Sequence, residues 1–493
     1  MKHHFRESAL LLHSGRGGRG GRAVRGLSVP ALLACVAVLG GCAGFSPDGG
    51  FGAVELSTKE RLGKDLVWAR SDADLDTVAR RVDELLARPL KVDDAVQIAL
   101  LNNRGLQADF QELGITEAEV VQAGRLPNPG FSFGRSRQGD EREIERGLHF
   151  NLARLVALPM IGRMEARRFE QVQGRVAMTV LALAADTRKA YFTAVAAAET
   201  VRYMQQVKQA ADASAELARR MEQVGNFNKL QRAREQAFYA NAVLRLAQAE
   251  QAQRSTRERL VRLLGVWGAQ TEFKLPERLP ELPPSPTELP DIEQVAMKQR
   301  LDVQGARLAA QQTASSLGLT RTTRFINVLE LGVMRNSSNE APTQRGWEIG
   351  FELPLFDWSG ARVARAEATY MQTLHRAAET AINARSEVRE AYTGYRSAYD
   401  IARHHRDEIV PLNQRIAEEN VLRYNGMLIG VFELLADARS QIASVNASIE
   451  ALRDFWIAQA DLDMALIGKP RPSAATGAAA GPAAAAEGGG APH

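Results

Sequence analysis

The chain has 493 residues, of which 45% are hydrophobic and only 6% are aromatic. Its formal net charge is +4, but residues 1–41 contain six basic residues and one acid, so the remainder has a formal net charge of −1 and does not indicate a nucleic-acid-binding surface. The composition excludes collagen, wholesale disorder and a disulfide scaffold, and no stretch after residue 41 offers the roughly 20 apolar residues of a membrane-spanning helix.

Residues 1–41 have the pattern of a signal peptide. A basic segment at 16–25 precedes a short apolar segment at 27–39, which ends in the motif L-G-G-C at Cys42. This motif resembles the bacterial lipobox, and the resemblance implies cleavage before Cys42 and lipid on its thiol. Ala43, in place of an aspartate, favours the outer membrane in that resemblance. A plain signal peptide with an incidental cysteine is the alternative.

Thiol and metal chemistry have little support in the mature chain. Cys35, the other cysteine, lies within the signal segment, so Cys42 is the one sulfhydryl left, and disulfides, thiolate zinc sites and thiol catalysis are excluded. His404 and His405 are adjacent and would point about 100° apart on a helix, so we expect no metal site there. We also find no Walker loop, dinucleotide glycines or nucleophile elbow. The sequence predicts a protein that is not an enzyme and has no cofactor beyond lipid on Cys42.

Two similar halves make up most of the mature chain. Ala190-Tyr191 and Ala391-Tyr392 are 201 residues apart, and Val224-Gly225 and Asn425-Gly426 have the same spacing. Such matches in one order indicate an internal duplication. The predicted division is a lipidated N-terminus and tether at 42–74, flexible over the glycine-rich 43–56; a first repeat at 75–273; a proline-rich extended connector at 274–290; a second repeat at 291–468; and a disordered tail at 469–493.

Helical periodicity dominates each repeat. Helical segments are predicted at 92–124 and 291–319, and no proline occurs between 160 and 275. A helix over about 162–223 would be roughly 90 Å long. Because no ordinary core is that long, we expect coiled-coil-like neighbours along its whole length.

Each repeat also contains one predicted β-hairpin, at about 130–154 and 325–355. Short segments alternate large apolar with small or polar residues, and polar loops at 138–145 and 336–344 separate them. The four strands would form either a half-buried sheet or part of a membrane barrel. Four strands are too few to close an aqueous barrel, so closure would require several chains.

Ordered motifs in the chain resemble the TolC-like outer-membrane efflux channels, in their lipoprotein branch. They are LKVDDAVQIALLNN at 90–103, LPNP at 126–129, the strand exits at 158–163 and 353–362, and YNGML at 424–428. The resemblance implies a mainly α fold with a small β part. In a homotrimer, the duplicated antiparallel helices would form an α-barrel crossing the periplasm, and four strands per protomer would form a shared 12-stranded barrel.

The same resemblance assigns roles to the ends of the helical hairpins. The two turns would contact a periplasmic adaptor and an inner-membrane pump through Val224, Gly225, Asn226, Asn425, Gly426 and Met427. Glu433 and Asp437 lie one helical turn apart beyond the second turn, and a trimer would repeat them around its axis. We consider a periplasmic gate in which Arg232 or Arg234 pairs with these acids; a solvated face with local ion pairs is the alternative.

The sequence thus predicts an outer-membrane exit duct of a tripartite efflux or type I secretion system. The exported substrate stays open among metal cations, drugs and polypeptides. A lipid-anchored periplasmic coiled-coil adaptor is the alternative of another class, but an adaptor would have one helical hairpin flanked by compact β domains, whereas this chain has two hairpins.

Overall fold

The computed structural model describes residues 44–322, 328–352, 356–426 and 428–470, without the side chains of 431–433 and 435. The described residues from Gly44 onward belong to one compact unit. The predicted signal peptide, Cys42, Met427 and nearly all of the predicted tail lie outside the described residues, as does the Glu433 side chain.

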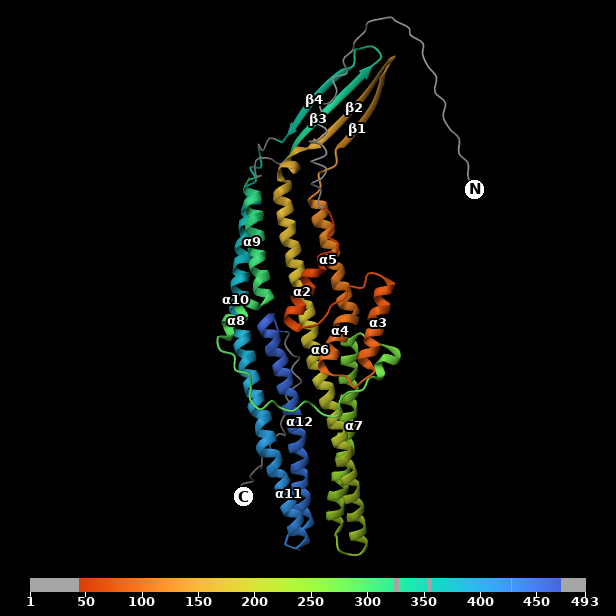
Figure 1. Ribbon diagram of the computed structural model, residues 1–493, viewed down its shortest axis with the longest axis vertical. Coiled ribbons are helices and arrows are strands. Elements are labelled where there is room, and N and C mark those ends of the chain that lie inside the picture. The colour runs from red at the N-terminus through yellow and green to blue at the C-terminus, as the bar shows by residue number, and fades with distance from the viewer. Residues whose placement is uncertain (1–43, 323–327, 353–355, 427, 471–493) are drawn as a thin grey trace, which may run out of the picture. The chain divides into compact units, whose positions relative to one another are not determined.

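The order of elements confirms the duplication, because helix pair, hairpin and long helices occur twice (Figure 1). The first half comprises α4 (Val92–Asn102), α5 (Arg104–Ala123), β1 (Gly130–Gln138), β2 (Glu141–Asn151), α6 (Leu152–Gln223) and α7 (Lys229–Leu264). The second comprises α8 (Ile292–Gln299), α9 (Leu301–Thr322), β3 (Leu329–Ser338), β4 (Gln344–Phe351), α10 (Gly360–His404), η2 (His405–Ile409), α11 (Val410–Asn425) and α12 (Val431–Ile467). The helices α2 (Phe51–Leu62) and α3 (Asp72–Leu86) precede both, and η1 (Gly268–Glu272) follows α7.

The flexible tether expected at 43–56 is wrong from Phe51 onward, because α2 begins there. Val54 of α2 is buried against a cluster that includes Phe110 of α5 and Val176 of α6. The ring of Phe51 meets that of Phe110 edge to face, with centroids 5.1 Å apart. The glycines at 49 and 50 gave the segment a linker-like composition, but the apolar residues behind them fix it to the helices.

The helix α6 has 72 residues and begins at Leu152, earlier than predicted. Pro159 is the eighth residue of the helix, where it removes one intrahelical hydrogen bond without ending the helix. Its counterpart is interrupted, because the π-helical turn η2 separates α10 from α11 just before Pro411. A proline removes one backbone donor and crowds the preceding turn, and a π turn relieves both problems.

Ion pairs join the two repeats along their helices, and a buried arginine joins helices within the second repeat. Lys189 of α6 lies 2.9 Å from Asp461 of α12, and Arg188 lies 3.4 Å from Asp463. Arg300, between α8 and α9, is 1% exposed and contacts Asp302 and Glu387 at 2.7 and 2.6 Å. It also donates to the carbonyl of Ala465 in α12 at 3.3 Å, so one side chain ties α9, α10 and α12 together.

Residues 274–290 contain neither helix nor strand, in keeping with their prolines. The segment is fixed by side chains of the long helices. Tyr399 of α10 donates to the carbonyl of Pro284 at 2.7 Å, and Trp456 of α12 donates to that of Pro280 at 3.1 Å. Leu279 and Leu282 of the segment itself are buried. The connector is therefore packed along its course.

The four strands form one antiparallel sheet in the order β1-β2-β3-β4, so the two predicted hairpins join through β2 and β3. The strands are longer than predicted. The predicted loop at 138–145 shrinks to Gly139 and Asp140, and the loop at 336–344 shrinks to 339–343. Leu152, expected at the end of a strand, instead begins α6. Figure 1 shows this sheet at one end of the helices and the turns after α6 and α11 at the other.

Candidate functional site: a two-faced sheet and two hairpin turns

One face of the sheet is apolar and exposed. The pairing register places Phe131, Leu148, Val333 and Trp347 in one row across all four strands. The next row toward the helices holds Phe150, Leu331 and Ile349. Trp347 is 71% exposed, and the other side chains of its row are exposed as well. A contiguous apolar face of this kind marks a contact with lipid or protein.

Exposed apolar side chains continue where the strands meet the helices. They include Leu155 and Val156 in the first turns of α6, and Phe356 and Trp358 before α10. The apolar surface therefore extends beyond the strands themselves.

The opposite face of the sheet is polar and acidic. The residues that face this side alternate with the apolar ones and include small side chains such as Ser132, Gly147 and Gly346. The five glutamates of the strands all share this face; they are Glu141, Glu143, Glu145, Glu330 and Glu348. The sheet thus has the apolar-out, polar-in alternation of a membrane barrel segment.

A histidine on the polar face has partners that the sequence did not reveal. His149 Nε2 lies 3.0 Å from Ser132 Oγ, and its Nδ1 lies 3.5 Å from Glu348 Oε1. His149 and Glu348 belong to β2 and β4, and Gly332 of β3 lies between them in the register. A Cβ at Gly332 would come within 2.6 Å of the Glu348 side chain. The glycine therefore lets two side chains meet across an intervening strand.

The first hairpin turn, between α6 and α7, contains Val224, Gly225 and Asn226. Gly225 has φ of 81°, which a residue with a side chain rarely adopts. The amide of Asn226 donates to the carbonyl of Met221 at 2.8 Å, closing the end of α6. Asn228 begins α7 with a capping box that it shares with Gln231. Val224 is exposed and available for contact.

The second turn, between α11 and α12, differs in its glycine. Gly426 has φ of −79°, so it does not adopt the left-handed conformation that Gly225 has in the first turn. The amide of Gly426 donates to the carbonyl of Leu422 at 3.0 Å, directly after Asn425 ends the helix. Leu428 is 77% exposed beyond it. Each turn therefore presents one large apolar side chain.

The residues considered as a gate have partners on their own hairpins. Arg232 lies 2.8 Å from Glu222 across the first turn. Asp437 accepts a hydrogen bond from the side-chain amide of Asn420 across the second turn. Arg234 lines a groove with Phe238 and Ile442. Within one protomer, then, Arg232 and Asp437 are held by local pairs.

A pair between the hairpins was missed by the sequence reasoning. Arg439 of α12 lies 3.5 Å from Glu235 of α7, and the Glu235 side chain is 1% exposed. Arg439 also lies over the ring of Phe238, with its Cζ 4.6 Å from the ring centroid. The spacing of 201 that relates the repeats makes Phe238 the counterpart of Arg439 itself. Opposite charges in two long polar helices gave no signal for this pairing.

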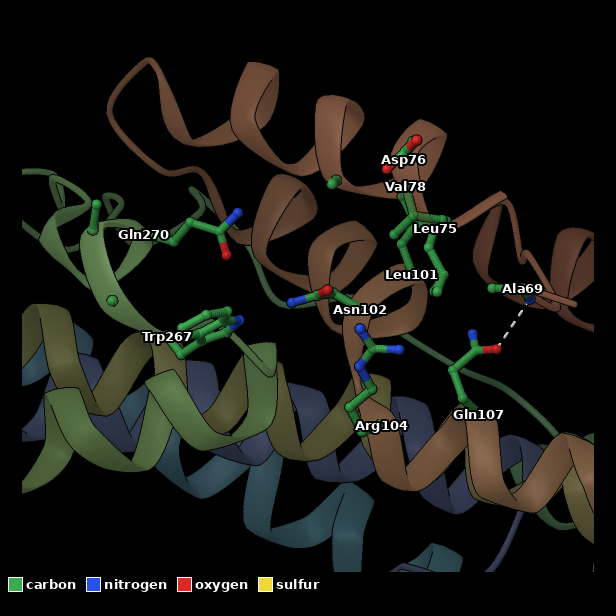
Figure 2. A pocket seen from close by; sticks show the side chains of 13 residues that line it. Ala69, Leu75, Asp76, Val78, Leu101, Asn102, Arg104, Gln107, Trp267 and Gln270 are labelled. Carbon is green, nitrogen blue, oxygen red and sulfur yellow. Dashed lines mark hydrogen bonds between the residues drawn. The ribbon is translucent and has the colours of Figure 1, made fainter. Parts of the chain in front are cut away.

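Figure 2 shows a surface pocket of about 460 Å³ bounded by α3, α4, α5 and η1. Trp267 forms one wall and is 81% exposed. Two of the polar side chains around it bind backbone: Gln107 accepts from the amide of Ala69 at 3.1 Å, and Asn102 donates to the carbonyl of Gly265 at 2.8 Å. These bonds hold the loops to the helices, so the pocket walls have a structural role.

Comparison with solved structures identifies the fold. This chain superposes on CusC, whose crystal structures concern transmembrane channel formation, with a TM-score of 0.64 at 17% identity. The superposition covers 77% of this chain and 92% of CusC. The Campylobacter jejuni outer-membrane channel CmeC gives 0.67 at 18% identity over 76% and 85%. The open Neisseria gonorrhoeae channel MtrE gives 0.65 at 18% identity over 76% and 89%. The chain has the TolC-like outer-membrane channel fold.

A curated relative agrees with this fold. The cobalt-zinc-cadmium resistance protein CzcC of Cupriavidus metallidurans is 25% identical over 281 residues, which cover 55% of this chain. The match spans 64% of that relative's length. No protein-family model matches the sequence. The predicted fold class, duplicated long helices with a four-stranded sheet, is confirmed by the likeness to the TolC-like fold.

Two searches within the described residues bear on membrane and metal chemistry. No helix of this part of the chain has the length and apolar character needed to cross a bilayer. Over the same residues, no three His, Cys, Asp or Glu side chains gather in a way that could hold a metal ion. His404 lies 3.2 Å from Glu408, one turn along its own helix region.

Proposed function

We propose that this protein is the outer-membrane exit duct of a tripartite efflux or type I secretion system, and that it acts as a passive channel with no catalytic step. The observation that carries the proposal is the two-faced sheet, whose exposed apolar rows would contact lipid while its polar face would line a water-filled lumen. Four strands close no such lumen, so three protomers would supply a 12-stranded barrel. The TolC-like fold supports this arrangement.

We further propose the anchor and the partners. The L-G-G-C motif supports a lipid on Cys42, which would fix the mature N-terminus to the outer membrane. The turns around Gly225 and Gly426 would dock a periplasmic adaptor, which in turn would meet an inner-membrane pump. The exposed Val224 and Leu428 would supply apolar contacts for that docking.

Cations are the cargo that the sheet favours. Its lumen-facing side carries five glutamates per protomer, and none of the strand arginines or lysines shares that side. A trimer would therefore concentrate cations at this end of the channel. The name of the relative CzcC, a cobalt-zinc-cadmium resistance protein, supports metal cations over drugs or polypeptides. Glu433 and Asp437 would add a second acidic constriction at the periplasmic end.

The native mass of the full-length protein, extracted from outer membranes in mild detergent, tests the channel. A mass of three lipidated protomers is expected. A monomer, or release of the Cys42→Ala variant into the soluble fraction, would contradict the channel and favour the coiled-coil adaptor. Retention of Cys42→Ala in the membrane as a trimer would show that the strands themselves hold the protein there.

Ion conduction tests the cargo preference separately. In planar bilayers under a salt gradient, the trimer is expected to give a reversal potential whose sign indicates selectivity for cations. A variant with Glu141, Glu143 and Glu145 changed to Gln should move that potential toward zero. An unchanged potential would mean that the acidic side of the sheet does not line the conducting path.

A further inference from the structure

Charge is segregated across the sheet. Its six arginines, Arg135, Arg137, Arg142, Arg146, Arg335 and Arg345, all lie on the apolar face, opposite the face that holds the glutamates. Every one of the six is exposed. A polar surface that was merely solvated would have no reason to separate the two signs so completely, so the arginines call for their own explanation.

The arginines face one another across the strands. Arg146 lies opposite Arg335, which lies opposite Arg345, in the row directly beyond Leu148, Val333 and Trp347. Nearer the turn, Arg137 lies opposite Arg142. Like charges in directly opposed positions destabilise a sheet. Among the described residues, no carboxylate forms an ion pair with any of these five, so their mutual repulsion is not offset by a paired acid there.

The position of the row along the sheet indicates its surroundings. An arginine facing lipid costs about 2–4 kcal/mol at the bilayer midplane but almost nothing near the headgroups. The row of Arg146, Arg335 and Arg345 borders the apolar rows on the side away from the helices. If the helices extend into the periplasm, as the proposed function requires, this border lies at the outer leaflet.

We propose that this arginine row is a binding surface for the phosphate groups of the phosphorylated glycolipid that forms the outer leaflet. Three adjacent strands place the Cα atoms of these arginines within about 10 Å of one another. Guanidinium binds phosphate through two parallel hydrogen bonds, and a phosphate between two arginines removes their mutual repulsion. The acyl chains of the same lipid would cover the row of Leu148, Val333 and Trp347.

Bisphosphorylated lipid A, and lipid A stripped of its phosphates, are the probes that test this proposal. Each is added to the purified full-length trimer in mild detergent, and the bound lipids are counted by native mass spectrometry. We expect the bisphosphorylated form to bind roughly tenfold more tightly. Equal binding of the two forms overturns the proposal with the wild-type protein alone, so the test does not depend on the folding of a variant.

Variants then locate the surface. Changing Arg146, Arg335 and Arg345 together to Gln is expected to abolish the preference, while changing all three to Lys should retain part of it. Exposed arginines of α7 provide a control with the same change in charge: Arg254, Arg259 and Arg262. A control that loses the preference as fully as the row variant would overturn the assignment.

This inference rests on the proposed function, but its failure is distinguishable. The mass recorded before lipid is added reports whether a trimer exists at all. A trimer that ignores the phosphates contradicts only the lipid proposal, whereas a monomer contradicts the channel and, with it, the lipid-facing role of the sheet.

Discussion

Arg439 of α12 and Glu235 of α7 form an ion pair of 3.5 Å that joins the two helical hairpins near their turns. Glu235 is almost fully buried and also accepts a hydrogen bond from Ser214 of α6 at 2.9 Å. Three helices from two repeats therefore meet at one carboxylate. Because the turns are the proposed docking sites, this contact sets their spacing within the protomer.

Changing Arg439 to Gln is expected to loosen the turns. The buried carboxylate of Glu235 would keep only the Ser214 hydroxyl, at a cost of about 2 kcal/mol in local stability. Hydrogen exchange should become faster over 229–245 and 434–445. Arg254→Gln, which removes an exposed pair of 3.9 Å with Glu250, is the control and should leave exchange near those turns unchanged. Equal exchange in the two variants would contradict the bracing role.

The two turn glycines should respond differently to alanine. Gly225 has φ of 81°, and its Gly225→Ala variant is expected to lose about 1–2 kcal/mol from backbone strain, although space for a Cβ is open. Gly426 has φ of −79°, and an added Cβ would meet its neighbours at an ordinary 3.5 Å. Gly426→Ala should therefore be nearly neutral. Thermal unfolding of both variants measures the difference, and equal losses would show that φ does not distinguish the turns.

The hydropathy pattern predicted the strands, but it made them too short at the ends next to the hairpin loops. From Glu141 to Arg146 the residues alternate in charge sign, with Ile144 the one apolar exception. This period of two in charge places arginine on one face and glutamate on the other. A hydropathy pattern cannot detect such alternation, because arginine and glutamate are both strongly polar and a run of polar residues predicts a loop. Charge alternation was the available signal, and it would have extended β2 to its observed start.

Contacts between helices that are far apart in the sequence could not be predicted from patterns within single segments. Repeat spacing and helical periodicity predicted α6 and α12, because those signals lie within single segments. The pairing of Glu235 with Arg439 depends on how the two repeats dock, and the contacts of Arg300 depend on how α9, α10 and α12 pack within the second repeat. Pro411 was visible in the sequence, but its effect, a π turn, depends on the neighbours that keep the helix from ending.

Arg300 is expected to be among the most sensitive positions. Arg300→Met would leave Asp302 and Glu387 without their cation, and unfolding should cost about 3 kcal/mol less. Thermal unfolding measures the loss. Adding Glu387→Gln to Arg300→Met should recover part of it, because one unpaired carboxylate is removed. Arg389→Gln, which breaks an exposed pair with Glu293, should cost under about 1 kcal/mol. A comparably small effect at Arg300 would contradict its anchoring role.

Alkaline unfolding should depend on Tyr191. Its hydroxyl donates to the carbonyl of Leu90 at 2.9 Å, and burial, with a smaller effect of Asp94, raises its pKa from 10.0 to about 12. Between those values the unfolded state loses the proton while the folded state keeps it. The free energy of unfolding should therefore fall by up to about 1.4 kcal/mol per pH unit above pH 10.

Tyr191→Phe removes that dependence. The variant loses a hydrogen bond worth about 1 kcal/mol at pH 8, but its stability should fall less steeply between pH 10 and 12. Denaturant unfolding followed by circular dichroism across this range gives both slopes. The partly exposed Tyr370, changed to Phe, is the control and should keep the wild-type slope. Parallel curves for Tyr191→Phe and the wild type would refute the assignment.

The proposed periplasmic constriction can be tested through Asp437. It accepts a hydrogen bond from the side-chain amide of Asn420 on its own hairpin, and this neutral donor leaves the negative charge of the carboxylate in place. Combining Asp437→Asn with Glu433→Gln should lower the cation-to-anion permeability ratio in planar bilayers by roughly twofold.

The control for that measurement changes Glu250 and Glu258 of α7 to Gln, which removes the same charge away from the turns. Single-channel conductance should also fall in the turn variant, because fewer cations would accumulate at the entrance. Because Asp437 and Asn420 would remain hydrogen-bonded as two amides, the turn should keep its fold and the effect should be one of charge. A permeability ratio and conductance equal to the control would mean that these acids are a solvated helix face held by local pairs.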